Sequence, residues 1–272
     1  MAGVNQEQID YWNERAGATW AELQERLDAL LSPLSAAGLQ AATVCSGERV
    51  LDVGCGCGDT SIALSKLGAR VLGVDVSAPM LEQARKRDGA IEYLEADAAV
   101  EPFQGDFDLV FSRFGVMFFA DPVAAFGNLH SALKPTGRLL FVCWQPPADN
   151  PWMATAGRAI APFLAPPEAP ADPRAPGPFA FADTAYVEHI LRQAGFSDIT
   201  VTSHQERLLV ADNLAEAVQF QTRVGPAARV MSELEGDQRT AALSAVEDAL
   251  RPFDQGEGLY LDSAVWLVSA SA

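Results

Sequence analysis

The segment around residue 54 has the residue types and the spacing best suited to chemistry. Glycines stand at positions 54, 56 and 58, directly after an apolar run at residues 50–53. Because glycine has no Cβ, Gly54, Gly56 and Gly58 would let backbone N–H groups approach a ligand closely. A helix predicted to begin near Thr60 adds positive potential at its N-terminus. We therefore interpret the segment as a cofactor-binding turn of the nucleotide type.

The spacing of these glycines separates two classes of cofactor. A dinucleotide fingerprint has the form G-x-G-x-x-G, which would place the third glycine where this chain has Asp59. A second acidic residue, Asp52, precedes the loop. A carboxylate beside the loop would repel a pyrophosphate and attract a ligand that carries an ammonium group. The loop therefore fits an ammonium-bearing cofactor better than a dinucleotide.

Residues 51–58, Leu-Asp-Val-Gly-Cys-Gly-Cys-Gly, resemble the first motif of the class I S-adenosylmethionine-dependent methyltransferases. The resemblance implies that this loop packs against the methionine part of the cofactor, S-adenosylmethionine. Asp75 ends the next predicted strand. A carboxylate at that place can accept hydrogen bonds from both ribose hydroxyls of the cofactor.

Further segments extend the resemblance in the order and at the distances typical of the family. It implies that Met80 packs on the adenine and that Asp97 accepts a hydrogen bond from the adenine amino group. Residues 107–112 resemble the fourth-strand motif, and residues 133–139 resemble the turn before strand five, with Thr136 where a second glycine is common. The predicted cofactor-binding residues are Asp52, Gly54, Cys55, Gly56, Gly58, Asp75, Val76, Met80, Asp97, Ala98, Ser112, Arg113 and Trp20.

Methyl transfer from a sulfonium ion needs alignment and exclusion of water more than it needs a catalytic triad. A general base is required only when the acceptor must lose a proton. No catalytic residue is therefore assigned, and His130, His189 and His204 are interpreted as structural. Arg113, at the end of the predicted fourth strand, either holds a carboxylate of a ligand or is an exposed loop residue. The predicted acceptor-lining residues are Tyr11, Met117, Trp144 and Trp152.

Strand-like and helix-like segments alternate between residues 45 and 145, which predicts parallel strands joined by helices. Together with the resemblance, this pattern implies an α/β, Rossmann-like, doubly wound sheet of seven strands, mostly parallel, with an antiparallel last strand. Pro33 and Gly38 are expected to break the helical pattern of residues 6–42. The predicted regions are an N-terminal helical cap (1–44), a cofactor-binding core (45–145), a proline-rich lid (146–182) and the remainder of the core (183–272) with a helical insertion (212–254).

Composition narrows the class of partner. The chain of 272 residues has 36 acidic and 19 basic residues and a formal net charge of -17. Nucleic acids and anionic membranes need a basic surface, so neither is predicted as a partner. No signal-like start and no apolar stretch of about 18 residues is visible, which predicts a cytoplasmic protein. Cys55 and Cys57 lack a second cysteine pair or a nearby histidine, so no metal site is predicted.

The sequence thus predicts a methyltransferase that uses S-adenosylmethionine and a small-molecule acceptor, with O-methylation favoured over N- or C-methylation. A peptide or protein acceptor stays open, because an acidic protein can bind a basic one. An NAD-dependent oxidoreductase and a non-catalytic S-adenosylmethionine-binding domain also stay open. Helices predicted at 213–224 and 237–250 would either complete the cap or form a homodimer contact.

Overall fold

The computed structural model describes residues 5–164 and 172–272. This described part of the chain forms two compact units. The described residues of the first unit are 5–145, 173–204 and 265–272, and those of the second unit are 146–164, 172 and 205–264. Part of the predicted lid, residues 165–171, lies outside the described residues. The division into a cap, a cofactor-binding core, a lid and the remainder of the core stays a prediction.

The described residues form a seven-stranded sheet with the strand order β3-β2-β1-β4-β5-β7-β6. The pairs that join β3, β2, β1, β4 and β5 are parallel, and β7 runs antiparallel to β5. The predicted α/β fold, with its antiparallel last strand, is confirmed. The strands are β1 (Arg49–Val53), β2 (Arg70–Asp75), β3 (Glu92–Glu95), β4 (Phe107–Arg113), β5 (Leu133–Trp144), β6 (Ser197–Ala211) and β7 (Leu259–Ser271).

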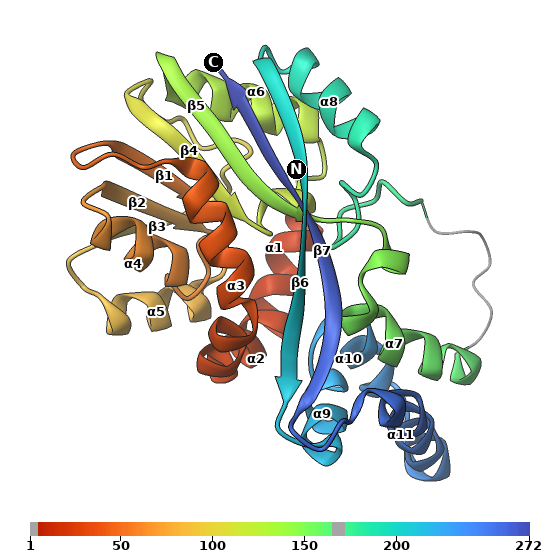
Figure 1. Cartoon of the computed structure of the whole chain (residues 1–272). Helices are drawn as coiled ribbons and strands as arrows, with labels where there is room; N and C mark the ends of the chain where they lie inside the picture. The colour runs from red at the N-terminus through yellow and green to blue at the C-terminus, as the bar shows by residue number, and fades with distance from the viewer. Residues whose placement is uncertain (1–4, 165–171) are drawn as a thin grey trace. The chain divides into compact units, whose positions relative to one another are not determined.

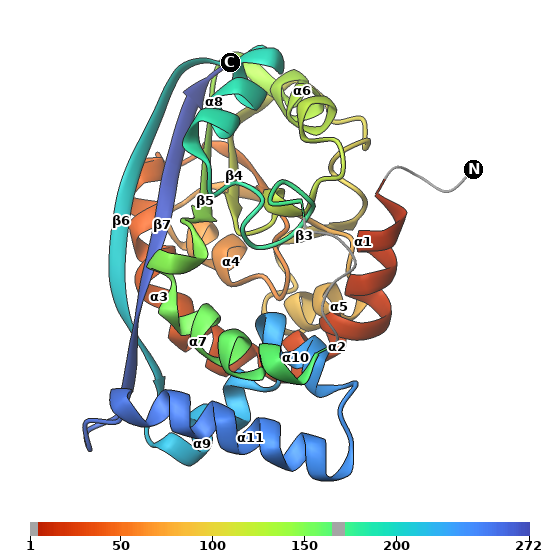
Figure 2. The same ribbon diagram turned by 90° about the vertical axis from the view of Figure 1, so that its right-hand side faces the viewer.

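Helices cover both faces of the sheet in the first unit, with α3 on one side and α6 and α8 on the other (Figures 1 and 2). On the α3 side, Leu64 of α4 joins Phe111 and Leu140 of the sheet in one buried apolar cluster. On the other side, Phe126 of α6 lies 5.4 Å from Phe141 between ring centroids. Neighbouring residues of a strand point to opposite faces, so Leu140 and Phe141 belong to different cores. These helices are α3 (Gln24–Ala42), α4 (Asp59–Lys66), α5 (Ala78–Arg87), α6 (Pro122–Ala132) and α8 (Thr184–Gln193).

The helical N-terminal segment of the first unit consists of α1 (Gln6–Tyr11), a π-helical turn (Trp12–Ala16) and α2 (Gly17–Glu22). Helix α2 packs against α5, which follows β2. The approach is close at Gly17, where a Cβ would lie 2.3 Å from the hydroxyl oxygen of Ser77. A glycine is therefore required where this segment meets the turn between β2 and α5.

Helix α3 continues through Pro33, so the expected break at Pro33 and Gly38 is wrong. Proline has no N–H to donate to the carbonyl of Ala29, four residues earlier. The hydroxyl of Ser32 donates to that carbonyl instead, at 2.9 Å. Gly38 brings the helix close to the sheet, because a Cβ there would lie 2.7 Å from the Cγ2 of Val142. Local compensation and close packing thus keep one continuous helix.

The second unit is mainly helical. Its first α-helix is α7, which is followed by a 3-10 turn at Ala161–Phe163. The side chain of Asn150 fixes the start of α7, because it donates to the Ala264 carbonyl at 2.9 Å and accepts from the Ala264 N–H at 3.0 Å. The helix predicted to reach residue 224 ends at Gln221, since extended backbone at Val224 precedes a separate helix, α10. The helices are α7 (Pro151–Ile160), α9 (Leu214–Gln221), α10 (Gly225–Met231) and α11 (Gly236–Leu250).

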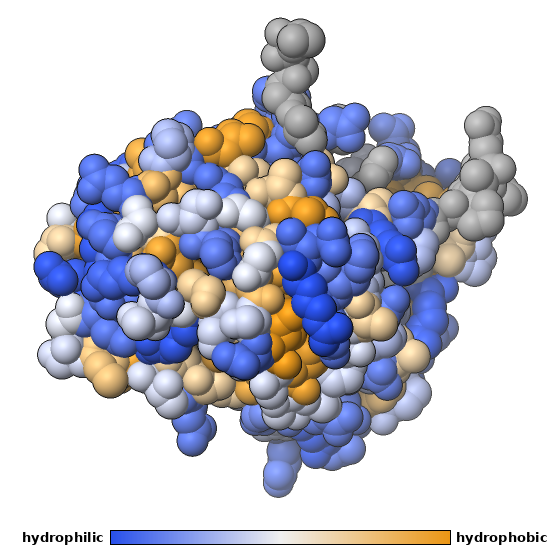
Figure 3. All heavy atoms as spheres, turned by 90° about the horizontal axis from the view of Figure 1, so that it is seen from above, coloured by the Kyte–Doolittle hydropathy of each residue, from blue (hydrophilic) through white to orange (hydrophobic). Residues whose placement is uncertain are grey.

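Hydrophilic residues cover most of the face shown in Figure 3, and apolar residues are interspersed among them. Large apolar side chains that are exposed in the described residues are Tyr11, Leu67, Val100, Leu164 and Leu209. Among the described residues, no helix combines the length and the apolar character needed to cross a membrane.

Candidate functional site

The glycine loop joins β1 to α4 and has a backbone shape that requires glycine. Gly54, Gly56 and Gly58 all have positive φ, at +69°, +54° and +82°. Residues with a Cβ rarely adopt this left-handed region. Gly54 also packs directly on another strand connection, because a Cβ at this position would lie 2.6 Å from the Cα of Gly115. The loop is therefore more than a tight turn, since its shape depends on glycine at three alternate positions.

Asp75 ends β2 and is oriented by the loop. The backbone N–H of Gly56 donates to Asp75 Oδ2, and that of Ser77 donates to Asp75 Oδ1, both at 2.8 Å. Burial raises the pKa of Asp75, and the backbone hydrogen bonds oppose this shift. Each carboxylate oxygen can accept more than one hydrogen bond. Both oxygens are thus held in place with capacity left for a ligand donor, such as a hydroxyl.

Two other predicted residues lie near this loop or on the next strand connection. Met80 of α5 approaches Gly56, where a Cβ would lie 2.7 Å from the Cε of Met80. Asp97 follows β3, and its Oδ1 accepts from the N–H of Ala99 at 3.0 Å and from Asn5 Nδ2 at 3.3 Å. The Oδ1 atom of Asn5 is buried and has no hydrogen-bond partner among the described residues. No motif or periodicity in the sequence indicates that Asn5 meets Asp97.

Asp52 lies behind the loop and is fully buried. Its Oδ2 accepts from the hydroxyls of Thr60 at 2.7 Å and Ser61 at 2.6 Å, both on α4. Its Oδ1 has no hydrogen-bond partner among the described residues. Burial raises the pKa of Asp52 to about 6, although the two hydroxyls favour the ionised form. A direct contact of Asp52 with a ligand stays a prediction.

Ser112 and Arg113 end β4 and are engaged by the protein. The Ser112 hydroxyl donates to the carbonyl of Val53 at 2.7 Å and ties β4 to the end of β1. Arg113 Nη1 pairs with Asp59 Oδ2 at 2.9 Å, and its side chain is 13% exposed. Arg113 is therefore not an exposed loop residue. Whether it also contacts a ligand stays a prediction.

An aromatic pair stands at the ends of β4 and β5. Phe114 stacks on Trp144 with ring centroids 4.0 Å apart and an interplanar angle of 4°. Phe114 has φ of +66°, which is uncommon for a residue with a bulky side chain. Its N–H donates to the carbonyl of Val142 at 3.0 Å, which helps to hold this conformation. Strained residues of this kind gather at functional sites, and the local sequence pattern did not reveal this one.

A second aromatic group surrounds Trp12 in the N-terminal segment. The Trp12 ring makes edge contacts with Tyr11, Trp20 and Phe118 at centroid distances of 5.5, 5.7 and 5.3 Å. Of the predicted acceptor-lining residues, Tyr11 is exposed, whereas Met117 and Trp144 are buried. Trp152 is also buried and lies on α7 in the second unit.

The remaining predicted cofactor residues have backbone or packing roles that the structure defines. The carbonyl of Val76 accepts from Asn13 Nδ2 at 2.8 Å, and Asn13 Oδ1 accepts from the N–H of Ala78 at 3.0 Å. Ala98 is buried, and its carbonyl accepts from Asn128 at 2.9 Å. Cys55 is buried in the loop, and its carbonyl accepts from the Gly58 N–H at 2.9 Å. Asn13 thus fixes the connection after Asp75, a role that its place in a helical pattern does not predict.

His130 and the two thiols of the loop lie in structural surroundings. His130 packs edge-on against Phe196 with centroids 4.9 Å apart. Burial raises the pKa of the Cys57 thiol to about 12, and it also raises the pKa of Cys55. Such thiols are protonated at neutral pH and are poor nucleophiles. Within the described ranges, no three His, Cys, Asp or Glu side chains are grouped so that they could hold a metal ion.

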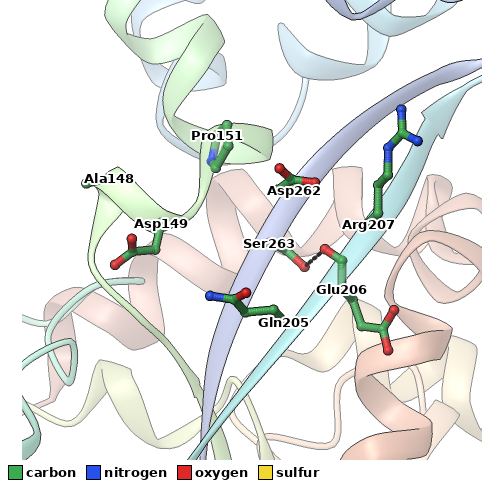
Figure 4. A pocket seen from close by; sticks show the side chains of 8 residues that line it. All are labelled: Ala148, Asp149, Pro151, Gln205, Glu206, Arg207, Asp262 and Ser263. Atoms are coloured by element: carbon green, nitrogen blue, oxygen red, sulfur yellow. Dashed lines mark hydrogen bonds between the residues drawn. The ribbon is translucent and has the colours of Figure 1, made fainter.

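A polar hollow of about 450 Å³ belongs to the second unit (Figure 4). Within it, the hydroxyl of Ser263 donates to the carbonyl of Glu206 at 2.9 Å. The hollow contains none of the predicted cofactor or acceptor residues. Its lining residues are Ala148, Asp149, Pro151, Gln205, Glu206, Arg207, Asp262 and Ser263.

This chain matches a family model and is similar in sequence to known proteins. A family model described as a methyltransferase domain matches residues 50–137. A demethylmenaquinone methyltransferase of Thermus thermophilus is 41% identical over 107 residues, which cover 37% of this chain and 49% of that protein. A malonyl-[acyl-carrier protein] O-methyltransferase of Salmonella typhimurium is 36% identical over 178 residues, which cover 62% of this chain and 68% of that protein. The chain spans about half the length of the Thermus thermophilus protein and of further curated relatives that it matches.

Solved structures share the fold. The YcgJ protein of Bacillus subtilis has a TM-score of 0.56 at 17% identity, covering 88% of this chain and 98% of that chain. A phosphoethanolamine N-methyltransferase of Haemonchus contortus, in complex with S-adenosylmethionine, has a TM-score of 0.52 at 20% identity, covering 88% of this chain and 52% of that chain. At these identities the likeness shows the fold alone. With the matching family model and the longer sequence match, the chain belongs to the class I S-adenosylmethionine-dependent methyltransferases.

Proposed function

We propose that this chain transfers a methyl group from S-adenosylmethionine to a small-molecule acceptor, with oxygen favoured over nitrogen and carbon. The observation that carries the proposal is the orientation of Asp75, whose two oxygens accept from Gly56 N–H and Ser77 N–H at 2.8 Å. This carboxylate stands beside a loop with three glycines of positive φ. A carboxylate held in this way suits the paired hydroxyls of a ribose.

The residues around the loop fit this donor. At Gly56 a Cβ would crowd Met80 Cε at 2.7 Å, so glycine keeps the backbone accessible beside an apolar side chain. We assign the ribose to Asp75, the adenine to Met80 and Asp97, and the methionine part to the loop. When bound, S-adenosylmethionine supplies a methyl group on a sulfonium ion whose leaving group is neutral. The buried carboxylate of Asp52 favours the cationic groups of such a ligand through its negative potential when ionised.

We assign the acceptor to the side of the site where β4 and β5 end. The stacked pair of Phe114 and Trp144 lies there, with Trp144 buried and Phe114 partly exposed. Aromatic rings exclude water and attract a sulfonium ion by cation–π interaction. Alignment of the acceptor atom with the methyl group is then the main task of the protein. The preference for oxygen is supported by the relative named malonyl-[acyl-carrier protein] O-methyltransferase, of which the match covers 68%.

A peptide acceptor is the second candidate. A relative named cypemycin N-terminal methyltransferase, from a Streptomyces species, is 36% identical over 106 residues. The net charge of -17 would also attract a basic peptide. An amine acceptor would need to be neutral at the moment of attack, so methylation of a peptide would increase with pH near the amine's pKa.

The test has a binding step and a transfer step. Thermal unfolding with S-adenosylhomocysteine or NAD separates the two cofactor classes, and we expect stabilisation by S-adenosylhomocysteine alone. Mass spectrometry then follows methyl transfer to a panel of phenols, quinols, acyl thioesters and peptides. Stabilisation by NAD alone would overturn the proposal. Donor binding without transfer to any acceptor would instead identify a non-catalytic binding domain.

A further inference from the structure

The glycine loop is also fixed at Cys57, by Arg87, which belongs to none of the sequence motifs. Arg87, the last residue of α5, donates from Nη1 to the carbonyl of Cys57 at 2.7 Å. Its Nη2 pairs with Asp28 Oδ2 of α3 at 2.8 Å. Gln24 donates to the same carboxylate oxygen of Asp28. The carbonyl of a cofactor-loop residue is thus linked through one guanidinium to a helix that precedes β1 in the chain.

A second ion pair lies at the other end of the loop, where a hydroxyl group of α3 contacts both of its members. Arg113 Nη1 pairs with Asp59 Oδ2 at 2.9 Å, and Asp59 is the first residue of α4. The same Nη1 donates to the hydroxyl of Ser35, also on α3. Ser35 in turn donates to Asp59 Oδ2 at 3.4 Å. Helix α3 therefore contacts groups that fix both Cys57 and the start of α4.

These ion pairs are largely shielded from solvent. The side chains of Arg87 and Asp28 are 23% and 18% exposed, and those of Arg113 and Asp59 are 13% and 27% exposed. Burial raises the pKa of Asp28, and the negative charge of Asp59 acts in the same direction. The hydrogen bond from Gln24 and the positive charges of Arg87 and Arg113 lower the pKa of Asp28 and so oppose this shift. Removing one guanidinium would leave a poorly hydrated carboxylate without its partner.

The loop needs such support because its glycines are conformationally free. Gly54, Gly56 and Gly58 lose more backbone entropy on ordering than other residues would. Asp75 accepts from the Gly56 N–H, and Arg87 donates to the Cys57 carbonyl. Two peptide groups of the loop, 55–56 and 57–58, are therefore fixed by residues of different elements. A loop ordered before binding does not have to be ordered by the ligand, which improves affinity.

We propose that Arg87 and Asp28 are positioning residues for the methyl donor, which hold the Cys57 carbonyl so that the loop is formed before the donor binds. This inference rests on the proposed function, because it takes residues 54–58 as the donor loop. Neither residue touches the donor in this assignment. They act through the loop backbone, and α3 thereby contributes to donor affinity.

The test compares substitutions on α5 and α3 by calorimetry with S-adenosylhomocysteine. Arg87→Gln should weaken binding roughly tenfold or more, as expected for loss of charged hydrogen bonds. Arg87→Lys should recover part of the affinity, because an ammonium group can meet one of the two partners but cannot bridge both. Lys86→Gln is the matched control, since Lys86 precedes Arg87 on the same helix and pairs only with exposed Glu82 among the described interactions. Its affinity should equal that of the wild type.

Amide hydrogen exchange without ligand provides a second measurement. Amides of residues 54–60 should exchange faster in Arg87→Gln than in the wild type, whereas amides of β5 should not change. Asp28→Asn keeps the size of the side chain but removes the charge, and it should weaken binding in the same direction. In the double variant the two losses should be less than additive, because both substitutions break one linked arrangement. If Arg87→Gln does not fold, Asp28→Asn and Arg87→Lys decide the question.

Unchanged affinity in folded Arg87→Gln, or in Asp28→Asn where that variant decides, would overturn this inference. So would equal weakening by Lys86→Gln, because the effect would then be a general one of charge on α5. A wild-type protein that does not bind S-adenosylhomocysteine would refute the proposed function itself, and this outcome is distinct from the others.

Discussion

The two sides of the proposed site in the first unit consist of different chemical groups. The donor side, where β1 to β3 end, uses backbone groups of a glycine loop together with the carboxylates of Asp75 and Asp97. The acceptor side, where β4 and β5 end, uses the rings of Phe114 and Trp144. Backbone geometry suits a ligand that stays the same throughout a family. Side chains suit a ligand that differs among its members, because they can be replaced without reshaping the loop.

The two sides also differ in electrostatics. On the donor side, Asp52 and Asp75 are carboxylates whose pKa is raised by burial. Such groups reduce the stability of the folded protein when they are ionised, and a cationic ligand would offset this cost. The aromatic pair on the acceptor side carries no charge. Substitutions on the donor side should therefore affect stability and donor binding, whereas those on the acceptor side should affect acceptor binding.

Gly54→Val should have the largest effect and would test how rigid the donor side is. The side chain would have to adopt φ near +69° and would place its Cβ 2.6 Å from the backbone of Gly115. We expect a loss of roughly 3–5 kcal/mol in the free energy of unfolding, measured by urea denaturation. Gly127→Ala on α6 is the control, because its Cβ would meet no atom within 4 Å. The Gly127→Ala substitution should increase the free energy of unfolding by about 0.5–1 kcal/mol, because alanine favours a helix more than glycine does. A Gly54→Val protein of wild-type stability would show that the loop can adapt.

Asp75→Ala should remove most of the donor affinity without a similar effect on acceptor binding. Loss of two charged hydrogen bonds to ribose would weaken S-adenosylhomocysteine binding by about 2–4 kcal/mol in calorimetry. Glu95→Ala provides the control, because Glu95 is an exposed acid paired in register with Asp75 on the neighbouring strand. Equal affinities of the Asp75→Ala protein and the wild type would disprove the assigned role.

The pH dependence of stability should reveal the buried acid of the donor side. Burial raises the pKa of Asp52 from 3.8 to about 6, so the folded state retains a proton that the unfolded chain releases. The contribution of Asp52 to the free energy of unfolding is therefore lost as pH rises from about 4 through about 6, by on the order of 2–3 kcal/mol. Urea denaturation at several pH values should show this decline relative to Asp52→Asn.

Asp108 offers a control of opposite sign for that measurement. The Arg49 N–H and the Lys134 ammonium group hold the pKa of Asp108 below its usual value. Its stabilising contribution should therefore be present above the unfolded pKa and be lost as pH falls through the lower folded pKa. Parallel pH curves for the wild type and Asp52→Asn would contradict the prediction for Asp52.

Phe114→Ala should have the smallest effect and would sharpen the assignment of the acceptor side. Loss of one ring from the stacked pair should raise the acceptor KM roughly threefold to tenfold, while the donor Kd should stay unchanged. Phe103→Ala is the matched control, since Phe103 makes an edge contact with Phe107 at the start of β4, the opposite end of the strand. If the donor Kd changed as much as the acceptor KM, Phe114 would contribute equally to binding of both ligands, and the assignment of separate donor and acceptor sides would be wrong.

Much of the donor side could be predicted from sequence because it is local. Gly54, Gly56 and Gly58 follow a buried strand directly, and Asp75 ends the next strand. Strand, turn and helix patterns place such residues at the same edge of a parallel sheet. The fold class followed from the same alternation. Their roles toward the donor stay predictions, which the variants above test.

Other features could not be predicted because they depend on residues far apart in the chain or on local compensation. Helix α3 passes Pro33 because Ser32 supplies the missing hydrogen bond, although a proline usually ends a helical pattern. The conformation of Phe114 depends on Trp144 and on the strand beside it. The sequence shows that Asp59 stands where a dinucleotide motif has its third glycine. Its ion pair with Arg113, 54 positions later, could be identified only from the three-dimensional structure.

The sequence by itself determined the alternating elements, the glycine loop and the acidic residues that follow the strands, since these depend on local periodicity and on backbone freedom at single positions. Only the tertiary structure decided which side chains meet the loop from outside, such as Arg87 and Asp28, and how deeply Asp52 is buried. The physical reason is that burial and ion pairing arise between elements that the chain brings together from distant positions. Periodicity within one segment carries no information about which segment it will face.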